Sequence, residues 1–97
     1  MNERKEIDQI DQKMTQLFEQ RMKLSAQIAQ HKFKQNQQVT DWKREAVIIS
    51  EETKRLQNEH LASYLKEFYQ DLFLISKQYQ AKIIQDLKSS AKKESKI

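Results

Sequence analysis

The stretch RKEIDQIDQKMTQLFEQR, residues 4–21, decides the fold, because it carries a regular apolar stripe into which one positive charge is set. The stripe advances in alternating steps of three and four residues, the pattern of a packed amphipathic helix. Its positions are, in order, Ile7, Ile10, Met14, Leu17, Arg21, Leu24 and Ile28. A guanidinium among apolar residues is costly unless an anion meets it. Arg21 therefore predicts either a carboxylate partner or an anionic ligand.

The composition indicates a small all-α protein. The 97 residues suit one domain, and they include neither Gly nor Pro, whereas average usage gives about ten or more of the two together. A chain without these helix breakers favours long helices joined by a few polar turns. Charged residues make up 33% and hydrophobic residues 37% of the chain. This balance is typical of extended helices that share a core with a partner.

Composition and motifs also exclude several classes of function. The chain has no cysteine, so disulfides and thiol chemistry are excluded, and it has no glycine for a phosphate-binding loop. His31 and His60 lack the paired spacing of metal ligands, so we expect no metal site. The net charge of +4 and the lysines near the C-terminus are interpreted as solubilising rather than as a nucleic-acid surface.

No apolar run approaches the ~20 residues of a membrane span, and the charged N-terminal stretch lacks the apolar core of a signal peptide. We therefore expect a cytoplasmic protein that binds no membrane.

Three helices are predicted. The first runs from about Asn2 to about Lys34, and the second follows the polar turn QNQQV, residues 35–39, with Thr40 or Asp41 as N-cap and an end near Leu56. The third follows QNEH, residues 57–60, and carries the apolar series Leu61, Leu65, Phe68, Leu72, Ile75, Tyr79, Ile83 and Leu87. We expect one helical domain over residues 1–90 and a polar, disordered tail over residues 91–97.

The length of the first helix predicts a dimer. About 33 residues span roughly 50 Å, whereas a compact chain of this size is only about 32 Å across. One chain cannot cover the apolar stripe of such a helix. We therefore expect two long helices to pair in an intertwined homodimer.

Polar residues on the predicted first helix mark a candidate site. Arg21 and Lys32 are eleven residues apart, which places them on one face, separated by roughly 16 Å along the axis. Two long cationic side chains at this spacing could grip one small polyanion. Arg4 lies about 25 Å from Arg21 and is rotated by roughly 100°, so a functional Arg4 would serve the partner's site in a symmetric dimer.

The other two helices add polar groups. Asp41, Arg44 and Glu45 share one face of the second helix, a pattern that alone favours an exposed capping and salt-bridge cluster. Ser76 and Gln80 share one face of the third helix, either as boundary residues or as hydrogen-bond donors aimed into a shared cavity. The whole set suits a small dianion with hydroxyl or ether oxygens. Catalysis there would work through orientation and electrostatic complementarity.

This ordered set resembles the all-helical class of chorismate mutases over roughly residues 4–80. The resemblance implies a stand-alone three-helix chain that exchanges its long first helix in a homodimer with two active sites. It also implies the cofactor-free Claisen rearrangement of chorismate to prephenate, an isomerase reaction of the shikimate pathway toward phenylalanine and tyrosine. The residues that carry it are Arg4, Ile7, Asp8, Asp11 and Arg21, then Lys32, then Val39, Asp41, Arg44 and Glu45, and finally Ser76 and Gln80.

The resemblance also implies how the substrate carboxylates are held. By position, Arg21 would clamp one carboxylate, and Arg4 from the other subunit would help to hold the second. Arg44 and Ser76 would line the site and support both carboxylates.

The remaining roles concern the oxygens at the reacting centre and on the ring. Lys32 and Gln80 would donate hydrogen bonds to the ether oxygen, where negative charge grows as the C–O bond breaks. Glu45, together with the backbone near Asp41, would receive the ring hydroxyl. Lys32, Gln80 and Arg21 are thus the expected catalytic residues.

Two alternatives stay open at this point. An isochorismate–pyruvate lyase has the same fold and a similar cationic pocket, although Glu45 and the residues around it favour the mutase. A non-catalytic helical interaction module, an antiparallel coiled-coil dimer, would instead pair Arg21 with a carboxylate across the interface.

Overall fold

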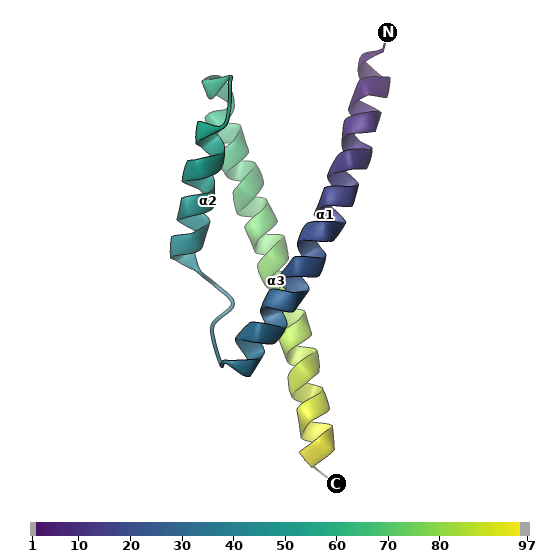
Figure 1. Cartoon of the computed structure of the whole chain (residues 1–97), viewed down its shortest axis with the longest axis vertical. Coiled ribbons are helices and arrows are strands. Elements are labelled where there is room, and N and C mark those ends of the chain that lie inside the picture. The colour runs from purple at the N-terminus through teal and green to yellow at the C-terminus, as the bar shows by residue number, and fades with distance from the viewer. Residues whose placement is uncertain (1, 96–97) are drawn as a thin grey trace.

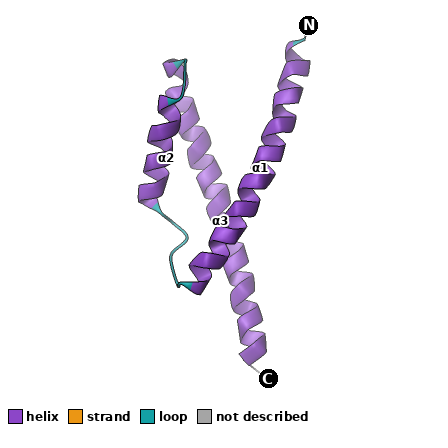
Figure 2. Ribbon diagram, viewed as in Figure 1, coloured by secondary structure: helices purple, strands orange, loops and turns teal. Residues whose placement is uncertain are grey.

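The protein folds into three α-helices and one short 3₁₀ turn (Figures 1 and 2). The computed structural model describes residues 2–95, with side chains for residues 2–92. The elements are α1 (Glu3–Lys34), α2 (Trp42–Lys54), the 3₁₀ turn η1 (Glu59–Leu61) and α3 (Ala62–Ser95). No strand occurs within residues 2–95. The structure confirms the all-α, three-helix prediction.

The two long helices cross, and α3 is the central element. Figure 1 shows α1 crossing α3 near the middle of the latter, so that the first halves of the two helices diverge. The shorter α2 runs beside the first half of α3, and α3 packs against both other helices. The molecule is elongated and thin, with extents of 63 × 30 × 14 Å.

Local signals explain where α1 ends and where α2 begins. After α1 the chain turns at Asn36, whose φ of 56° lies in the left-handed region, a conformation that Asn tolerates better than most other non-glycine residues. The Asp41 side chain accepts a 3.0 Å hydrogen bond from the backbone N–H of Arg44. Asp41 is therefore the N-cap of α2, one of the two residues predicted for that role.

Two boundaries differ from the prediction. α2 ends at Lys54, short of Leu56, and the chain then forms η1, where the Asn58 side chain accepts a hydrogen bond from the His60 backbone N–H at 3.1 Å. α3 continues through Ser95, into the segment predicted as a disordered tail. Ala, Lys and Glu in that segment are good helix formers, and no Pro or Gly interrupts them. Residues 96–97 lie outside the described part of the chain.

The chain buries little apolar surface on its own. Among the described side chains, Ala29 and Phe73 are the buried apolar residues. The first half of α1 instead exposes its apolar stripe at Ile7, Ile10, Met14 and Leu17, together with the neighbouring Phe18. The radius of gyration is 17.5 Å, against about 12–13 Å for a compact chain of this length. A single chain therefore leaves the apolar stripe in the first half of α1 uncovered, as the length of this helix predicts.

Within residues 2–95, no helix is both long and apolar enough to cross a membrane.

Candidate active site

A cavity of about 420 Å³ lies where α1, α3 and the start of α2 come together. Its wall is partly apolar, from residues such as Leu24, Ile28, Ile48 and Phe73. Seven of the eight residues predicted for the site line this cavity: Arg21, Lys32, Asp41, Arg44, Glu45, Ser76 and Gln80. Residues predicted from three separate segments of the sequence therefore meet in one place.

Arg21 projects from α1 toward α3. Its Nη1 donates a 2.8 Å hydrogen bond to Ser76 Oγ, and its guanidinium carbon lies 5.9 Å from the centroid of the buried Phe73 ring. Within residues 2–92, no carboxylate pairs with this half-buried guanidinium. A cation so placed retains most of its donors for an anion that enters the cavity.

Lys32 connects the end of α1 with the turn before α2. Its Nζ donates to the backbone carbonyl of Val39 over 2.6 Å, and the side chain is half-buried. An ammonium has three donors, so this bond leaves others for a ligand. The bond also holds the turn that carries Asp41 against the end of α1.

Gln80 is a buried residue of the cavity wall, next to Ser25 of α1. Gln80 and Ser25 are 8% and 5% exposed, and Gln80 Nε2 donates to Ser25 Oγ at 2.8 Å. Gln80 Oε1 is buried and has no hydrogen-bond partner among the described residues. A buried, unpartnered carbonyl oxygen is costly, which makes this amide the least satisfied group of the site.

The α2 side of the cavity carries a neutralised carboxylate. Glu45 Oε2 lies 3.3 Å from Lys77 Nζ of α3, and Lys77 also lies 4.8 Å from the centroid of the Trp42 ring. Asp41 is engaged as the cap of α2, and Arg44 is exposed at the rim. Of the predicted exposed capping and salt-bridge cluster, the cap is present, but within residues 2–92 no ion pair joins Asp41, Arg44 and Glu45. Glu45 instead pairs with Lys77 in the cavity wall.

The charge of the cavity suits a dianion. Four cationic side chains line it, against the two carboxylates of Asp41 and Glu45. The excess is two positive charges, in a partly enclosed space where charges interact more strongly than in bulk water. The cations are Arg21, Lys32, Arg44 and Lys77.

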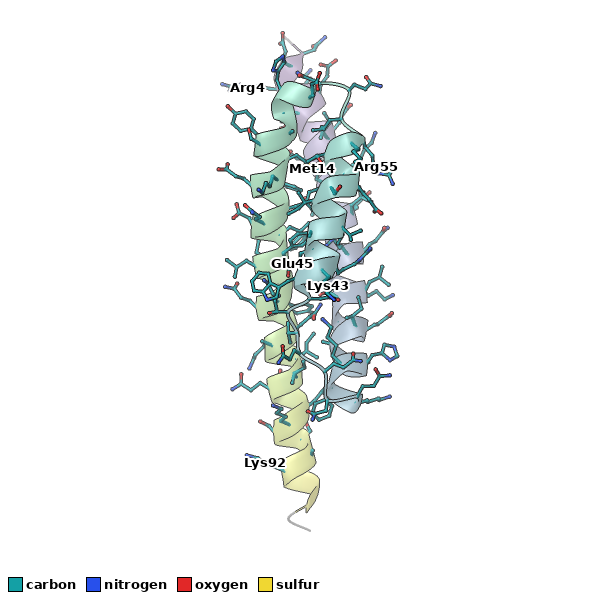
Figure 3. All side chains as sticks on the ribbon, turned by 90° about the vertical axis from the view of Figure 1, so that its left-hand side faces the viewer. Arg4, Met14, Lys43, Glu45, Arg55 and Lys92 are labelled. Carbon is teal, nitrogen blue, oxygen red and sulfur yellow. The ribbon has the colours of Figure 1, made fainter. Side chains whose placement is uncertain are left out.

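Arg4 does not line this cavity. It lies in the first turn of α1, exposed, and Figure 3 shows it far from Glu45 along the length of the molecule. Helix geometry predicts this separation, because Arg4 and Arg21 stand about 25 Å apart on a straight helix.

Two lining residues were missed from the sequence, Ser25 and Lys77. Ser25 had a usable signal, since it stands four residues after Arg21 and seven before Lys32, on the same helical face. Lys77 had none, because its partners Glu45 and Trp42 lie on another helix. Only the packing of α2 against α3 reveals it.

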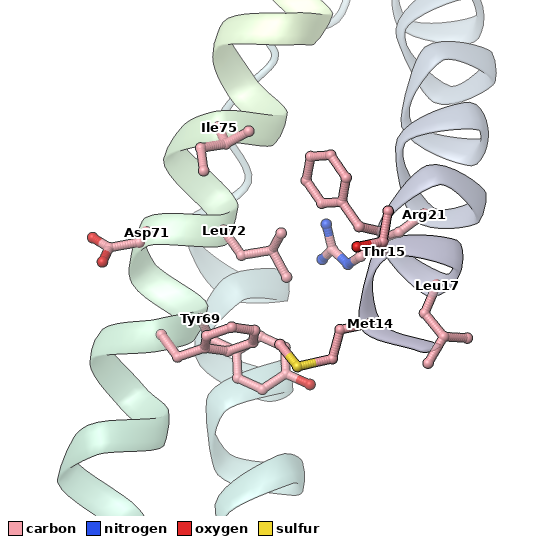
Figure 4. Close-up of a pocket in the computed structure, with 10 residues that line it drawn as sticks. Met14, Thr15, Leu17, Arg21, Tyr69, Asp71, Leu72 and Ile75 are labelled. Carbon is pink, nitrogen blue, oxygen red and sulfur yellow. The ribbon is translucent and has the colours of Figure 1, made fainter. Parts of the chain in front are cut away.

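A second cavity, of about 500 Å³, opens between the first halves of α1 and α3 (Figure 4). Apolar side chains dominate its wall, including Met14, Phe18, Phe68 and Leu72. Arg21 lines both cavities. The second cavity is larger but lacks the convergent polar groups of the first, so the smaller one is the candidate active site.

Comparison with known proteins agrees with this geometry. No curated protein and no solved structure matches the chain. A family model described as chorismate mutase type II matches residues 3–81, a range that includes α1, α2 and every residue that lines the polar cavity. The chain belongs to the chorismate mutase type II family.

Proposed function

We propose that this protein is a chorismate mutase, which converts chorismate to prephenate by an intramolecular Claisen rearrangement. The observation that carries the proposal is Arg21, a half-buried cation with no carboxylate partner among the described side chains, in a polar cavity with two excess positive charges. The substrate is a dianion, so its charge complements that of the cavity.

The carboxylates of the substrate would be bound by arginines. Arg21 donates to one of them, with its guanidinium held in position by Ser76 and by the Phe73 ring. Arg44 adds positive charge at the rim, and Arg4 of a second subunit would complete the binding of the other carboxylate. Planar, bidentate arginine contacts fix the orientation of a carboxylate. They therefore restrict a flexible substrate to the chair-like shape that reacts.

Lys32 and Gln80 would act on the ether oxygen. As the C–O bond breaks, negative charge grows on that oxygen, and hydrogen bonds from Lys32 Nζ and Gln80 Nε2 become stronger. Interactions that are stronger in the transition state than in the ground state raise the rate. No proton has to be transferred in this step, and no bond forms between the protein and the substrate.

Glu45 would receive the ring hydroxyl of the substrate. Because Lys77 binds Oε2, the other carboxylate oxygen of Glu45 is available to accept a hydrogen bond. The pairing with Lys77 also reduces the repulsion between Glu45 and the dianion. The backbone near Asp41 would add a further contact to the hydroxyl.

The active form would be a homodimer. The first half of α1 exposes an apolar stripe, and the apolar cavity beside it is open. A second copy of the chain, with its own exposed α1, would cover both surfaces. It would also bring the missing Arg4 to a cavity that the Arg4 of the same chain does not reach.

The test is the fate of chorismate with the purified protein, with prephenate identified as the product. Lys32→Ala should lower kcat/KM by about 100-fold or more, the usual cost of one donor at a developing oxyanion. Lys34→Ala, which removes an exposed lysine from the same turn of α1, serves as the matched control and should leave activity unchanged.

A folded protein that leaves chorismate intact would contradict the proposal. Release of pyruvate from isochorismate would then identify the protein as the lyase of the same fold. Inactivity with both substrates would favour the interaction module.

A further inference from the structure

Ser25 and Gln80 form a buried pair whose hydrogen bonding is incomplete. Gln80 Nε2 donates to Ser25 Oγ at 2.8 Å, while Gln80 Oε1 has no partner among the described residues. Both side chains are more than nine-tenths buried, so bulk water does not compensate for the unpartnered oxygen.

The hydroxyl proton of Ser25 is also unused. Hydroxyls on helices commonly donate to the carbonyl four residues earlier, as Thr15 does to Asp11 and Thr53 to Ile49. Within the described part of the chain, the Ser25 hydroxyl hydrogen-bonds with Gln80 alone, and there it accepts. One buried pair thus contains an unused donor and an unused acceptor.

Rotation of the Gln80 amide by 180° resolves both defects. The amide oxygen and nitrogen occupy nearly the same volume, so the exchange requires no repacking. Oε1 then lies opposite Ser25 Oγ, at a separation suited to an O–H···O hydrogen bond, and Ser25 donates. Both N–H groups of Gln80 Nε2 are then free, in a residue that lines the cavity. Such free N–H groups need an acceptor, which a bound ligand can supply.

We propose that Ser25 is a positioning residue for the rearrangement, a proposal that rests on the function given above. When the substrate binds, its ether oxygen supplies the acceptor that Nε2 lacks. The Ser25 hydroxyl then donates to Oε1 and holds the amide with its nitrogen toward the reacting oxygen. In this role Ser25 acts through Gln80 rather than directly on the substrate.

The first test is a kinetic double-mutant cycle. Ser25→Ala should lower kcat about 3- to 10-fold with little change in KM, as expected for loss of one neutral hydrogen bond that acts mainly in the transition state. In the Gln80→Ala background, the same substitution should change kcat by less than about 1.5-fold, because no amide remains to be oriented. Ser63→Ala, at an exposed serine of α3, is the matched control and should have no effect in either background.

The second test is a pH profile, which a purely structural role of Ser25 would not move. In Gln80→Glu, the introduced carboxyl group must be protonated to donate to the ether oxygen, so activity should rise as the pH falls. The Ser25 hydroxyl binds the charged carboxylate more strongly than the neutral acid. It therefore lowers the pH at which Gln80→Glu has half of its maximal activity. Ser25→Ala combined with Gln80→Glu should move the midpoint upward by roughly 0.5 to 1 pH unit.

Other charges near position 80 do not obscure this comparison, because they are the same in both variants. They come from all three helices and comprise Arg21 and Lys32 of α1, Asp41 before α2, Arg44 and Glu45 of α2, and Lys77 of α3.

The outcomes separate this inference from the proposed function. Equal losses from Ser25→Ala in both backgrounds, with an unmoved pH midpoint, would overturn the role of Ser25 and leave the mutase intact. Full activity in Gln80→Ala would overturn the role of Gln80 and that of Ser25 with it. If the unaltered protein forms no prephenate from chorismate, the proposed function itself is overturned.

The Ser25→Ala variant should keep its helix, because Ala is the strongest helix former. Circular dichroism verifies that the variant is folded.

Discussion

The guanidinium of Arg21 interrupts an apolar stripe and has a serine hydroxyl and a phenyl ring as its neighbours. A buried or half-buried charge without a carboxylate partner destabilises a fold. The same property leaves its donors available for an anionic ligand. At this one residue, stability and ligand binding therefore make opposite demands.

Arg21→Leu should accordingly separate stability from activity. We expect the melting temperature to stay equal or rise, because an apolar side chain suits the stripe, while kcat/KM for chorismate falls about 100-fold or more. Thermal unfolding and prephenate formation measure the two effects. Arg55→Leu, which removes an exposed arginine paired with Glu52, is the control and should leave kcat/KM unchanged. Retained activity in Arg21→Leu would show that the polar cavity is not the active site.

At the residue scale, the sequence was most informative about cationic and polar residues placed against an apolar pattern. Arg21 and Lys32 stand on one helical face, and both line the cavity. What the sequence could not supply were the partners of these residues. Arg21 pairs with Ser76, and Gln80 with Ser25, across 55 positions of the chain in each case. Such pairings depend on how the helices cross, which periodicity within one helix does not encode.

At the scale of the elements, α2 is joined to α3 by Lys77. Its side chain is 24% exposed, and its ammonium lies near the Glu45 carboxylate and the Trp42 ring. These contacts place the N-terminal end of α2 over the polar cavity. They also combine electrostatic and cation–π attraction, which are both stronger for partly desolvated groups than for exposed ones.

Lys77→Met should weaken substrate binding by leaving the charge of Glu45 uncompensated. We expect KM for chorismate to rise about 3- to 10-fold at low ionic strength, and the rise to shrink in high salt as the repulsion is screened. Steady-state kinetics at two salt concentrations measure this. Trp42, the single tryptophan of the chain, reports the loss of the ammonium through its fluorescence. Lys82→Met, at an exposed lysine, is the control, and a salt-independent KM in Lys77→Met would contradict the electrostatic role.

The element boundaries followed from the sequence where a side chain marks them. Asp41 marks the start of α2 with a cap that its position predicts. Asn58 caps η1 in the same way, through the hydrogen bond from the His60 N–H, but one 3₁₀ turn is too short for an apolar periodicity that would predict it. α3 extends through Ser95, beyond the predicted helix, because Ala, Lys and Glu favour a helix even where the composition is polar.

At the scale of the whole molecule, the small core and the exposed α1 stripe leave much apolar surface of a single chain open to solvent. With an extent of 63 Å and few buried apolar side chains among those described, the chain cannot reach the usual burial of a domain of its size. Pairing with a second copy would supply the missing contacts. It would also place Arg4 of each chain near the cavity of the other.

Complementation between two defective chains tests this shared site. Arg4→Ala and Arg21→Leu should each be impaired alone. When the two are produced together, random pairing makes about half of the dimers mixed, and each mixed dimer has one cavity with both arginines. Activity should then recover to about a quarter of the unaltered level, measured as prephenate formation.

The control for complementation pairs Arg21→Leu with Lys32→Ala. Both residues line the cavity of their own chain, so every cavity in the mixed dimer keeps one defect and activity should not recover. Failure of the Arg4→Ala mixture to recover would show that Arg4 does not act across the dimer.

The hydrogen bond from Lys32 to the Val39 carbonyl has a consequence for the entropy of the reaction. A free lysine side chain has about 2 kcal/mol of rotational freedom to lose. In this protein, folding already restricts that motion, because the ammonium is anchored to the turn before any substrate arrives. The substrate then meets a cation whose position needs little reorganisation as charge develops on the ether oxygen. Part of the decrease in the activation barrier would thus originate in the folding of the seven-residue connection between α1 and α2, rather than in the binding of the substrate.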